Sequence, residues 1–108
     1  MTYKRGDVCL VEEHDTQGSE IKKTRPWVIV GANQINNARH TLVVVPLSTK
    51  VKEIPGLSIK VYFDNNFLCA VLDQIRAVDK KRILRQEGNL STYEMELIDA
   101  GLRQVLCL

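Results

Sequence analysis

Short apolar segments separated by turn-forming residues are the feature that most constrains the fold of this chain. The segments are rich in β-branched or alternating apolar side chains, and Gly, Pro, Asn and Asp lie between them. They predict five β-strands, at residues 6–11, 27–30, 41–47, 57–63 and 67–74. Several short strands followed by one helix indicate a small, strongly bent sheet or barrel of the α+β class.

The third segment, with Val43, Val44 and Val45, is the most buried-looking part of the chain. Pro46 near its end predicts an edge strand or a bulge, because proline cannot donate to a sheet. The last two segments flank an Asp-Asn-Asn turn and predict a hairpin. Residues 12–24 are predicted to form a long polar loop, and residues 33–39 a turn.

The final element is predicted to be a helix. Ser91 and Glu94 form a capping box, and Asp79 similarly predicts a capped helical turn at residues 79–82, before a short sixth strand at 83–84. Gly101 either weakens the helix or marks the close approach of another backbone. One helical face carries the apolar residues Met95, Ile98, Leu102, Val105 and Leu106.

Length and composition predict one domain spanning residues 1–108. A net charge of +2 is too mild to identify a nucleic-acid binder by itself. No signal peptide or membrane-spanning stretch is recognisable. Cys9, Cys69 and Cys107 are odd in number and far apart, and His14 and His40 lie far from them. This pattern predicts reduced thiols in a cytoplasmic protein, with no metal site.

Residues 18–27 combine a mobile loop with the start of a strand. Pro26 pushes Arg25 toward an extended conformation, so the guanidinium leaves the backbone at a defined point, as a phosphate-gripping group would. The alternative is a surface salt bridge. The chain has two clusters of basic residues, and each can be either a set of phosphate contacts or a solvated face. One contains Lys22, Lys23 and Arg25, and the other contains Arg76, Lys80, Lys81, Arg82 and Arg85.

Five motifs together resemble the MazF/PemK family of toxins from toxin–antitoxin pairs. The resemblance covers nearly the whole chain, in the family's order and spacing. The motifs are Lys4-Arg5-Gly6-Asp7-Val8, Gly18-Ser19-Glu20, Thr24-Arg25-Pro26, Val43-Val44-Val45-Pro46-Leu47-Ser48 and Asp73-Gln74-Ile75-Arg76-Ala77-Val78-Asp79-Lys80.

The resemblance implies an SH3-like barrel with a C-terminal helix, a homodimer, and a metal-independent, sequence-selective endoribonuclease inhibited by a cognate antitoxin. It needs no cofactor. The family's catalytic candidates fall on Arg25 and Ser48. The family usually has Thr-Ser after Pro-Leu, whereas this chain has Ser48 and then Thr49, so either hydroxyl can be the one that faces the phosphate.

Metal-free RNA cleavage needs a base for the 2′-hydroxyl, a cation for the developing phosphorane charge and an acid for the leaving oxygen. Arg25 suits the cation, and Ser48 or Thr49 would position the phosphate. Glu20, Asp73 and His14 are candidate bases, although His14 can instead contact RNA and Asp73 can anchor a turn. The predicted RNA contacts are Glu20, Lys22, Lys23, Asp73, Gln74, Arg76 and His14.

Two other functions fit the same fold. A toxin of the CcdB branch would inhibit DNA gyrase by protein contact and would need neither Arg25 nor Ser48 in these positions. An SH3-like interaction module would have no toxicity. Trp27 offers a stacking face for a base, although its apolar neighbours favour packing in the core.

Overall fold

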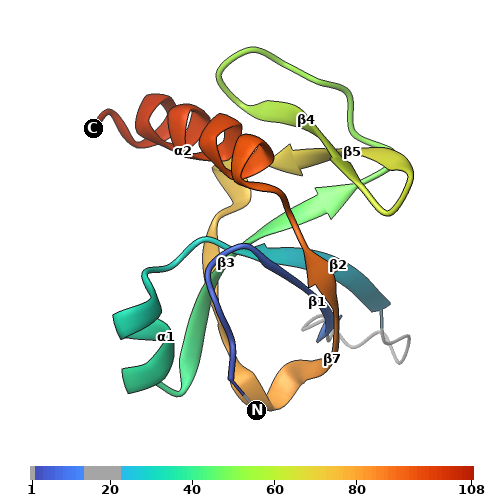
Figure 1. Cartoon of the computed structure of the whole chain (residues 1–108). Coiled ribbons are helices and arrows are strands. Elements are labelled where there is room, and N and C mark those ends of the chain that lie inside the picture. Colours follow the sequence, from blue (N-terminus) through green and yellow to red (C-terminus); the bar gives the residue numbers. More distant parts are fainter. Residues whose placement is uncertain (1, 14–22) are drawn as a thin grey trace, which may run out of the picture.

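The computed structural model describes residues 2–13 and 23–108. Figure 1 shows a bent sheet, with α2 lying beside the β4–β5 hairpin and α1 at the far end of β3. No described helix is long and apolar enough to cross a bilayer. The described elements are β1 (Asp7–Glu13), β2 (Lys23–Ile29), α1 (Asn33–Ala38), β3 (Thr41–Ser48), β4 (Ser58–Phe63), β5 (Asn66–Val71), the 3₁₀ turn η1 (Leu72–Gln74), β6 (Arg76–Asp79), the 3₁₀ turn η2 (Lys80–Arg82), β7 (Ile83–Asn89) and α2 (Thr92–Leu106).

The strands pair antiparallel in the order β4-β5-β3-β2-β1-β7, with β6 also beside β3. The first half of β3 pairs with β6 and its end pairs with β5. The sheet bends because β3 pairs with one strand along its first half and with another at its end. The sheet is not closed, since β4 and β7 lie at its two ends. The predicted class, mainly β with a C-terminal helix and a barrel-like sheet, is confirmed.

Pro46 does not lie on an edge strand, so that alternative of the prediction is wrong. The strand β3 is central, and Pro46 is opposite Trp27 on β2. Proline is tolerated there because β3 changes partners at this point: its pairing with β6 ends at Val44 and its pairing with β5 begins at Leu47.

The strands β1, β2 and β3 bury side chains on both faces, as the apolar alternation of β1 predicts. On one face, Val8, Val28 and Val45 pack in a cluster that Ile98 of α2 completes. On the opposite face lies a second cluster, which contains Trp27 at 2% exposure and so confirms its role in the core. The other buried members of this second cluster are Cys9, Val11, Ile29, Leu42, Val44 and Val78.

Helix α2 begins where the capping residues predict. The Ser91 hydroxyl accepts the Glu94 N–H, while the Glu94 carboxylate accepts the Tyr62 N–H of β4 instead of closing the box. Gly101 lies against the side chain of Leu72, not against another backbone. On the apolar face predicted for this helix, Met95 and Ile98 are buried, whereas Leu106 is 46% exposed.

Three further boundaries differ from the sequence predictions. The turn expected at 33–39 is helix α1, held by the buried Asn36 side chain, which donates to the Gly31 carbonyl at 3.0 Å. The strand expected at 67–74 ends at Val71, because the chain turns into η1, where the Ile75 N–H donates to the Leu72 carbonyl at 3.3 Å. The short strand expected at 83–84 continues to Asn89 because β1 pairs with it.

The predicted turns are otherwise present. Asp64 and Asn65 adopt left-handed conformations, with φ of 53° and 63°, and they connect β4 and β5 in the expected hairpin. Asp79 caps η2 by accepting the Lys81 N–H at 2.8 Å. Of the long loop expected at 12–24, residues 12–13 continue β1 and residues 23–24 begin β2, while 14–22 lie outside the described residues.

Candidate active site

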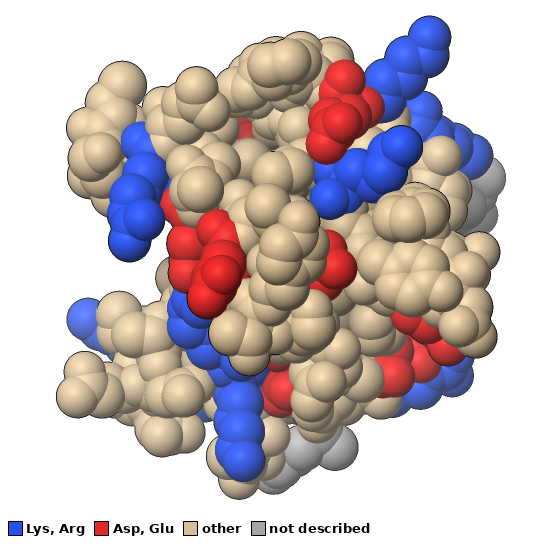
Figure 2. All heavy atoms as spheres, turned by 45° about the horizontal axis from the view of Figure 1, so that its top comes forward, with Lys and Arg blue, Asp and Glu red and all other residues tan. Residues whose placement is uncertain are grey.

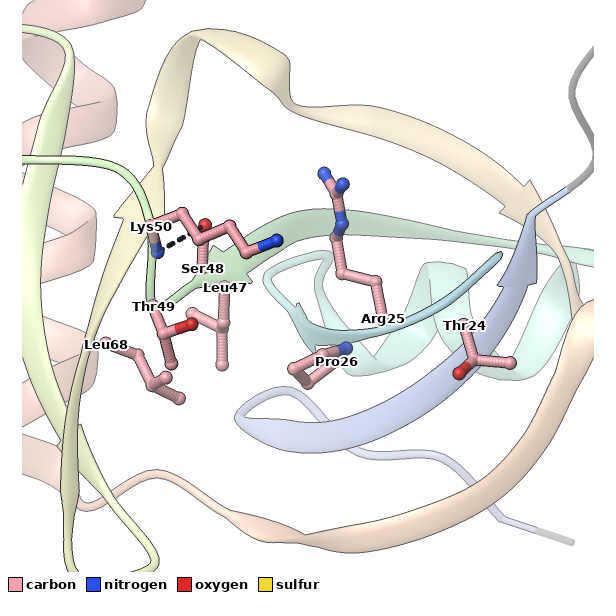
Figure 3. Close-up of a pocket in the computed structure, with 8 residues that line it drawn as sticks. All are labelled: Thr24, Arg25, Pro26, Leu47, Ser48, Thr49, Lys50 and Leu68. Atoms are coloured by element: carbon pink, nitrogen blue, oxygen red, sulfur yellow. Dashed lines mark hydrogen bonds between the residues drawn. The ribbon is translucent and has the colours of Figure 1, made fainter. Parts of the chain in front are cut away.

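Arg25 and Ser48 line the same pocket, which has a volume of about 410 Å³. Figure 3 shows the guanidinium of Arg25, the hydroxyl of Ser48 and the ammonium of Lys50 on the same side of the pocket, and Lys50 extends toward Arg25. The remaining lining residues are Thr24, Pro26, Leu47, Thr49 and Leu68. Two cations and three hydroxyl side chains therefore line a pocket of the size that small ligands use.

The strand register explains why Arg25 and Ser48 meet. Strands β2 and β3 pair at Trp27 and Pro46, and Arg25 and Ser48 each lie two residues beyond this last pair, on its face of the sheet. Residues opposite each other in an antiparallel pair project from the same face of the sheet. Ser48 pairs in turn with Cys69 on β5, and Cys69 with Lys60 on β4. We call Arg25, Ser48, Cys69 and Lys60 the cross-strand row.

The charged residues that line the pocket, Arg25 and Lys50, are both positive. Among the side chains of residues 2–12 and 24–108, no carboxylate forms an ion pair with Arg25. The salt-bridge alternative for Arg25 therefore has no partner in the described part of the chain. Its guanidinium is free to bind two oxygens of a phosphate at once.

Lys50 is a functional candidate that the sequence analysis missed. Its backbone N–H donates to the Ser48 hydroxyl oxygen at 3.1 Å, which fixes the tight turn directly after β3. This turn brings the lysine side chain over the pocket (Figure 3). The available signal was its position two residues after Ser48, in the loop that follows the Val-Val-Val-Pro-Leu strand.

Two neighbouring hollows border the pocket, and Thr49 and Leu68 contribute to the lining of all three. One hollow, of about 270 Å³, extends past Lys60 and Phe67. The other, of about 290 Å³, extends past Asp64 and Glu87. We call the three together the groove. A groove is the shape required to hold an extended polymer on both sides of a reacting bond.

Several residues predicted for the site lie elsewhere. Asp73 and Gln74 are exposed on η1, and Arg76 on β6 lies over the Trp27 ring at 5.6 Å from its centroid. None of these three lines the described groove. The predictions for His14, Glu20 and Lys22 lie outside the described residues, and so does the side chain of Lys23, whose backbone begins β2.

The three cysteines are free thiols. Burial, followed by the negative charges of Asp7 and Glu87, raises the pKa of Cys9 to about 11. Burial also raises the pKa of Cys69, although this residue lies in the cross-strand row. Both thiols therefore stay protonated near neutral pH and are poor nucleophiles. No group of three His, Cys, Asp or Glu side chains converges within the described residues.

Charges of both signs are spread over the surface that Figure 2 shows, with several basic side chains at its upper right. This distribution agrees with the small net charge of +2. Non-specific attraction to nucleic acid by a large basic field is therefore weak, and the site depends on individual cations such as Arg25 and Lys50.

A family model for PemK-like, MazF-like toxins of type II toxin–antitoxin systems matches residues 4–106. The chain belongs to this family. The sequence resemblance to MazF/PemK toxins is thereby confirmed. Among curated relatives, the chain is 27% identical over 109 residues to "Endoribonuclease MazF9" of Mycobacterium tuberculosis, covering 93% of this chain and 92% of that one.

Solved structures of MazF proteins share the fold. One is described as an endoribonuclease in complex with its cognate antitoxin from Mycobacterial species; it has a TM-score of 0.81 and 23% identity, covering 98% of this chain and 96% of the other. A MazE–MazF complex from Deinococcus radiodurans has a TM-score of 0.86 and 14% identity, covering 100% and 98%. At these identities the likeness establishes the shared fold.

Proposed function

We propose that this MazF/PemK family toxin is a metal-independent endoribonuclease that cuts single-stranded RNA at a specific sequence. The observation that carries the proposal is the cross-strand placement of Arg25 and Ser48 in a pocket with Lys50. An endoribonuclease among the curated relatives, aligned over 93% of this chain, supports it.

In the proposed reaction the 2′-hydroxyl gives its proton to a base and attacks its neighbouring phosphate. The bond to the 5′ oxygen of the next nucleotide breaks, that oxygen takes up a proton and leaves as a hydroxyl, and a cyclic phosphate remains. Arg25 binds the non-bridging oxygens and stabilises the charge that develops on the phosphorane. Lys50 adds a second positive charge on the same side of the pocket. The hydroxyls of Ser48 and Thr49 hold the phosphate in line, and the position of Ser48 in the cross-strand row favours it for the direct contact.

The proton of the 2′-hydroxyl needs an acceptor. We retain Glu20 and His14 as the candidate bases, because they precede β2 in the sequence and Thr24, near the start of β2, lines the pocket. Asp73 is a weaker candidate since it does not line the described groove. The test is the cleavage rate of Glu20→Gln and His14→Gln over a range of pH. The variant that lacks the base should lose the rise in rate on the acidic side of the pH profile.

The proposed partners are RNA, a cognate antitoxin with an acidic, partly disordered segment, and a second copy of this chain, in the cytoplasm. Arg25 and Lys50 would attract an acidic segment into the same groove that holds RNA, so binding of the antitoxin would block cleavage. The described antitoxin complexes of structurally similar MazF proteins support this partner. A monomeric mass at micromolar concentration would contradict the dimer.

The decisive experiment is cleavage of a long single-stranded RNA in the presence of EDTA, with the ends mapped. We expect the wild type to cut at one short recurring sequence and to leave cyclic phosphate ends, and Arg25→Ala to leave the RNA intact. Arg39→Ala is the matched control, because Arg39 is exposed at the end of α1.

Intact RNA with the wild type would contradict the ribonuclease. Inhibition of DNA supercoiling by gyrase in a parallel assay would then identify a CcdB-like mechanism. If neither assay responds and growth is unaffected by expression, the chain is an interaction module.

A further inference from the structure

We propose that Phe67, with Lys60 beside it, forms a subsite that stacks one base of the RNA next to the cleaved bond. This inference rests on the proposed ribonuclease function and identifies a residue that fixes the substrate. The sequence analysis did not single out either residue, and neither belongs to the motifs that carry the family resemblance.

Phe67 lies on the solvent side of the β4–β5 hairpin. It is 64% exposed, and its partner across the hairpin, Tyr62, is 46% exposed. The two rings meet edge to face, with centroids 5.0 Å apart. An exposed aromatic pair of this kind is held in place by its own contacts and marks an interaction site.

The opposite side of the hairpin already supplies the core. Val61 and Ala70 are almost completely buried there, and Leu68 and Phe63 pack against the same cluster. Side chains alternate between the two sides of a strand. Phe67 therefore cannot be explained as a core residue, and its side chain belongs to the surface of the groove.

The position of Phe67 relative to the reacting centre follows from the strand register. Phe67 lies two residues before Cys69, so it projects from the same face as Cys69 and the rest of the cross-strand row. The hollow that contains Phe67 also contains Ser48 and Thr49. One strand spacing and two residues of rise put Phe67 roughly 8 Å from Ser48, within reach of an adjoining nucleotide.

The cation beside Phe67 favours RNA as the occupant. The Lys60 ammonium lies over the Phe67 ring at 5.6 Å from its centroid, and Lys52 lines the same hollow. The one carboxylate in that hollow, Glu53, accepts the Lys60 backbone N–H at 2.9 Å. An aromatic ring for a base, with a lysine for the adjoining phosphate, is the combination that single-stranded nucleic acids require.

The test uses an RNA that carries the mapped cleavage sequence with a 2′-deoxy group at the attacked position, so that it binds and is not cut. We expect Phe67→Ala to weaken its binding by about fivefold to a hundredfold, and Phe67→Trp to restore it. Tyr93→Ala is the matched control, because Tyr93 is 65% exposed and lies outside the lining of the described groove.

A series of the same RNAs with one base removed at each position identifies the stacked nucleotide. The wild type should lose affinity at one position beside the cleaved bond, and Phe67→Ala should be insensitive at that position alone. Lys60→Met should reduce the slope of log affinity against log salt by about 0.7.

Equal binding of every RNA by the wild type and Phe67→Ala would overturn the subsite while leaving the ribonuclease intact, provided that Arg25→Ala still abolishes cleavage. If Phe67→Ala lost only its binding to the antitoxin, the aromatic pair would be a protein-recognition site. That result would also overturn the proposed base-stacking subsite. No cleavage and no RNA binding by the wild type would overturn both proposals.

Discussion

Arg25 on β2 and Ser48 on β3 each lie two residues beyond the Trp27–Pro46 pair, and both line the same pocket. The distance between them is therefore set by the sheet and not by a loop. Positioning by a rigid element is a requirement for groups that must hold a phosphate in one geometry.

Arg25→Lys tests whether the shape of the cation matters as well as its charge. Lysine keeps the positive charge but cannot bind two phosphate oxygens through one planar group. We expect the single-turnover rate to fall by about a hundredfold or more, with RNA affinity changed much less. Arg39→Lys should retain the wild-type rate. A rate for Arg25→Lys within a few-fold of wild type would show that charge alone is sufficient.

Lys50→Met tests the cation that the sequence analysis missed. Removing one phosphate contact should weaken RNA binding and lower the slope of log affinity against log salt by about 0.7. Methionine keeps much of the length of the side chain, so packing is little changed. Lys81→Met, at an exposed site on η2, is the control that should leave both values unaltered. An unchanged salt slope for Lys50→Met would exclude Lys50 from contact with RNA.

Gly101→Ala should destabilise the fold although alanine is the better helix former. The new methyl group would overlap with the side chain of Leu72, which is 1% exposed and would have to shift. Overpacking costs about 1–3 kcal/mol, against a gain in helix propensity of about 1 kcal/mol. We expect a lower free energy of unfolding in urea, by about 1 kcal/mol. In a Leu72→Ala background, Gly101→Ala should be neutral or stabilising, and equal effects in both backgrounds would contradict the contact.

Stability should fall at alkaline pH through the Cys9 thiol. Its pKa is about 11 in the folded protein, against an ordinary value of 9.0, so the unfolded chain releases the proton first. The contribution of this thiol is complete below pH 9.0 and disappears as the pH rises to about 11. The loss is about 2–3 kcal/mol.

The measurement for Cys9 is urea unfolding between pH 8 and 11, for the wild type and for Cys9→Ala. Other groups titrate in this range, so the difference between the two proteins isolates the thiol. We expect the alanine variant to show a shallower decline in stability with pH. Parallel declines would show that Cys9 does not ionise on unfolding in this window.

The strands were predictable from the sequence because their apolar residues satisfy local rules. The alternation of apolar and polar residues on both sides of the Asp64–Asn65 turn predicts the hairpin, and Ser91 predicts the start of α2. Helix α1 was missed because its asparagines are poor helix formers, and it is stabilised by contacts distant in sequence, such as that between the Arg5 N–H and Asn33. Propensity does not report such contacts.

The candidate site was predictable only in part, for a similar reason. Arg25 and Ser48 belong to recognisable motifs, and the register then brings them together. Lys50 and Phe67 carry no motif, and their relevance follows from which strands are neighbours. Asp73 and Gln74 belong to a motif, but the turn η1 places them away from the described groove, because β5 ends three residues earlier than expected.

The pairing of β1 with β7 has a consequence for how the chain folds. Asp7 on β1 is opposite Asn89 on β7, and Arg5 contacts Asp99 of α2. The hydrogen bonds along this edge of β1 therefore cannot form until the last quarter of the chain has been made. Contacts between segments so distant in sequence make folding slow, because loop closure must precede the gain in pairing. The nascent chain therefore contains Arg25, Ser48 and Phe67 long before it has the strand and helix that complete the sheet around them.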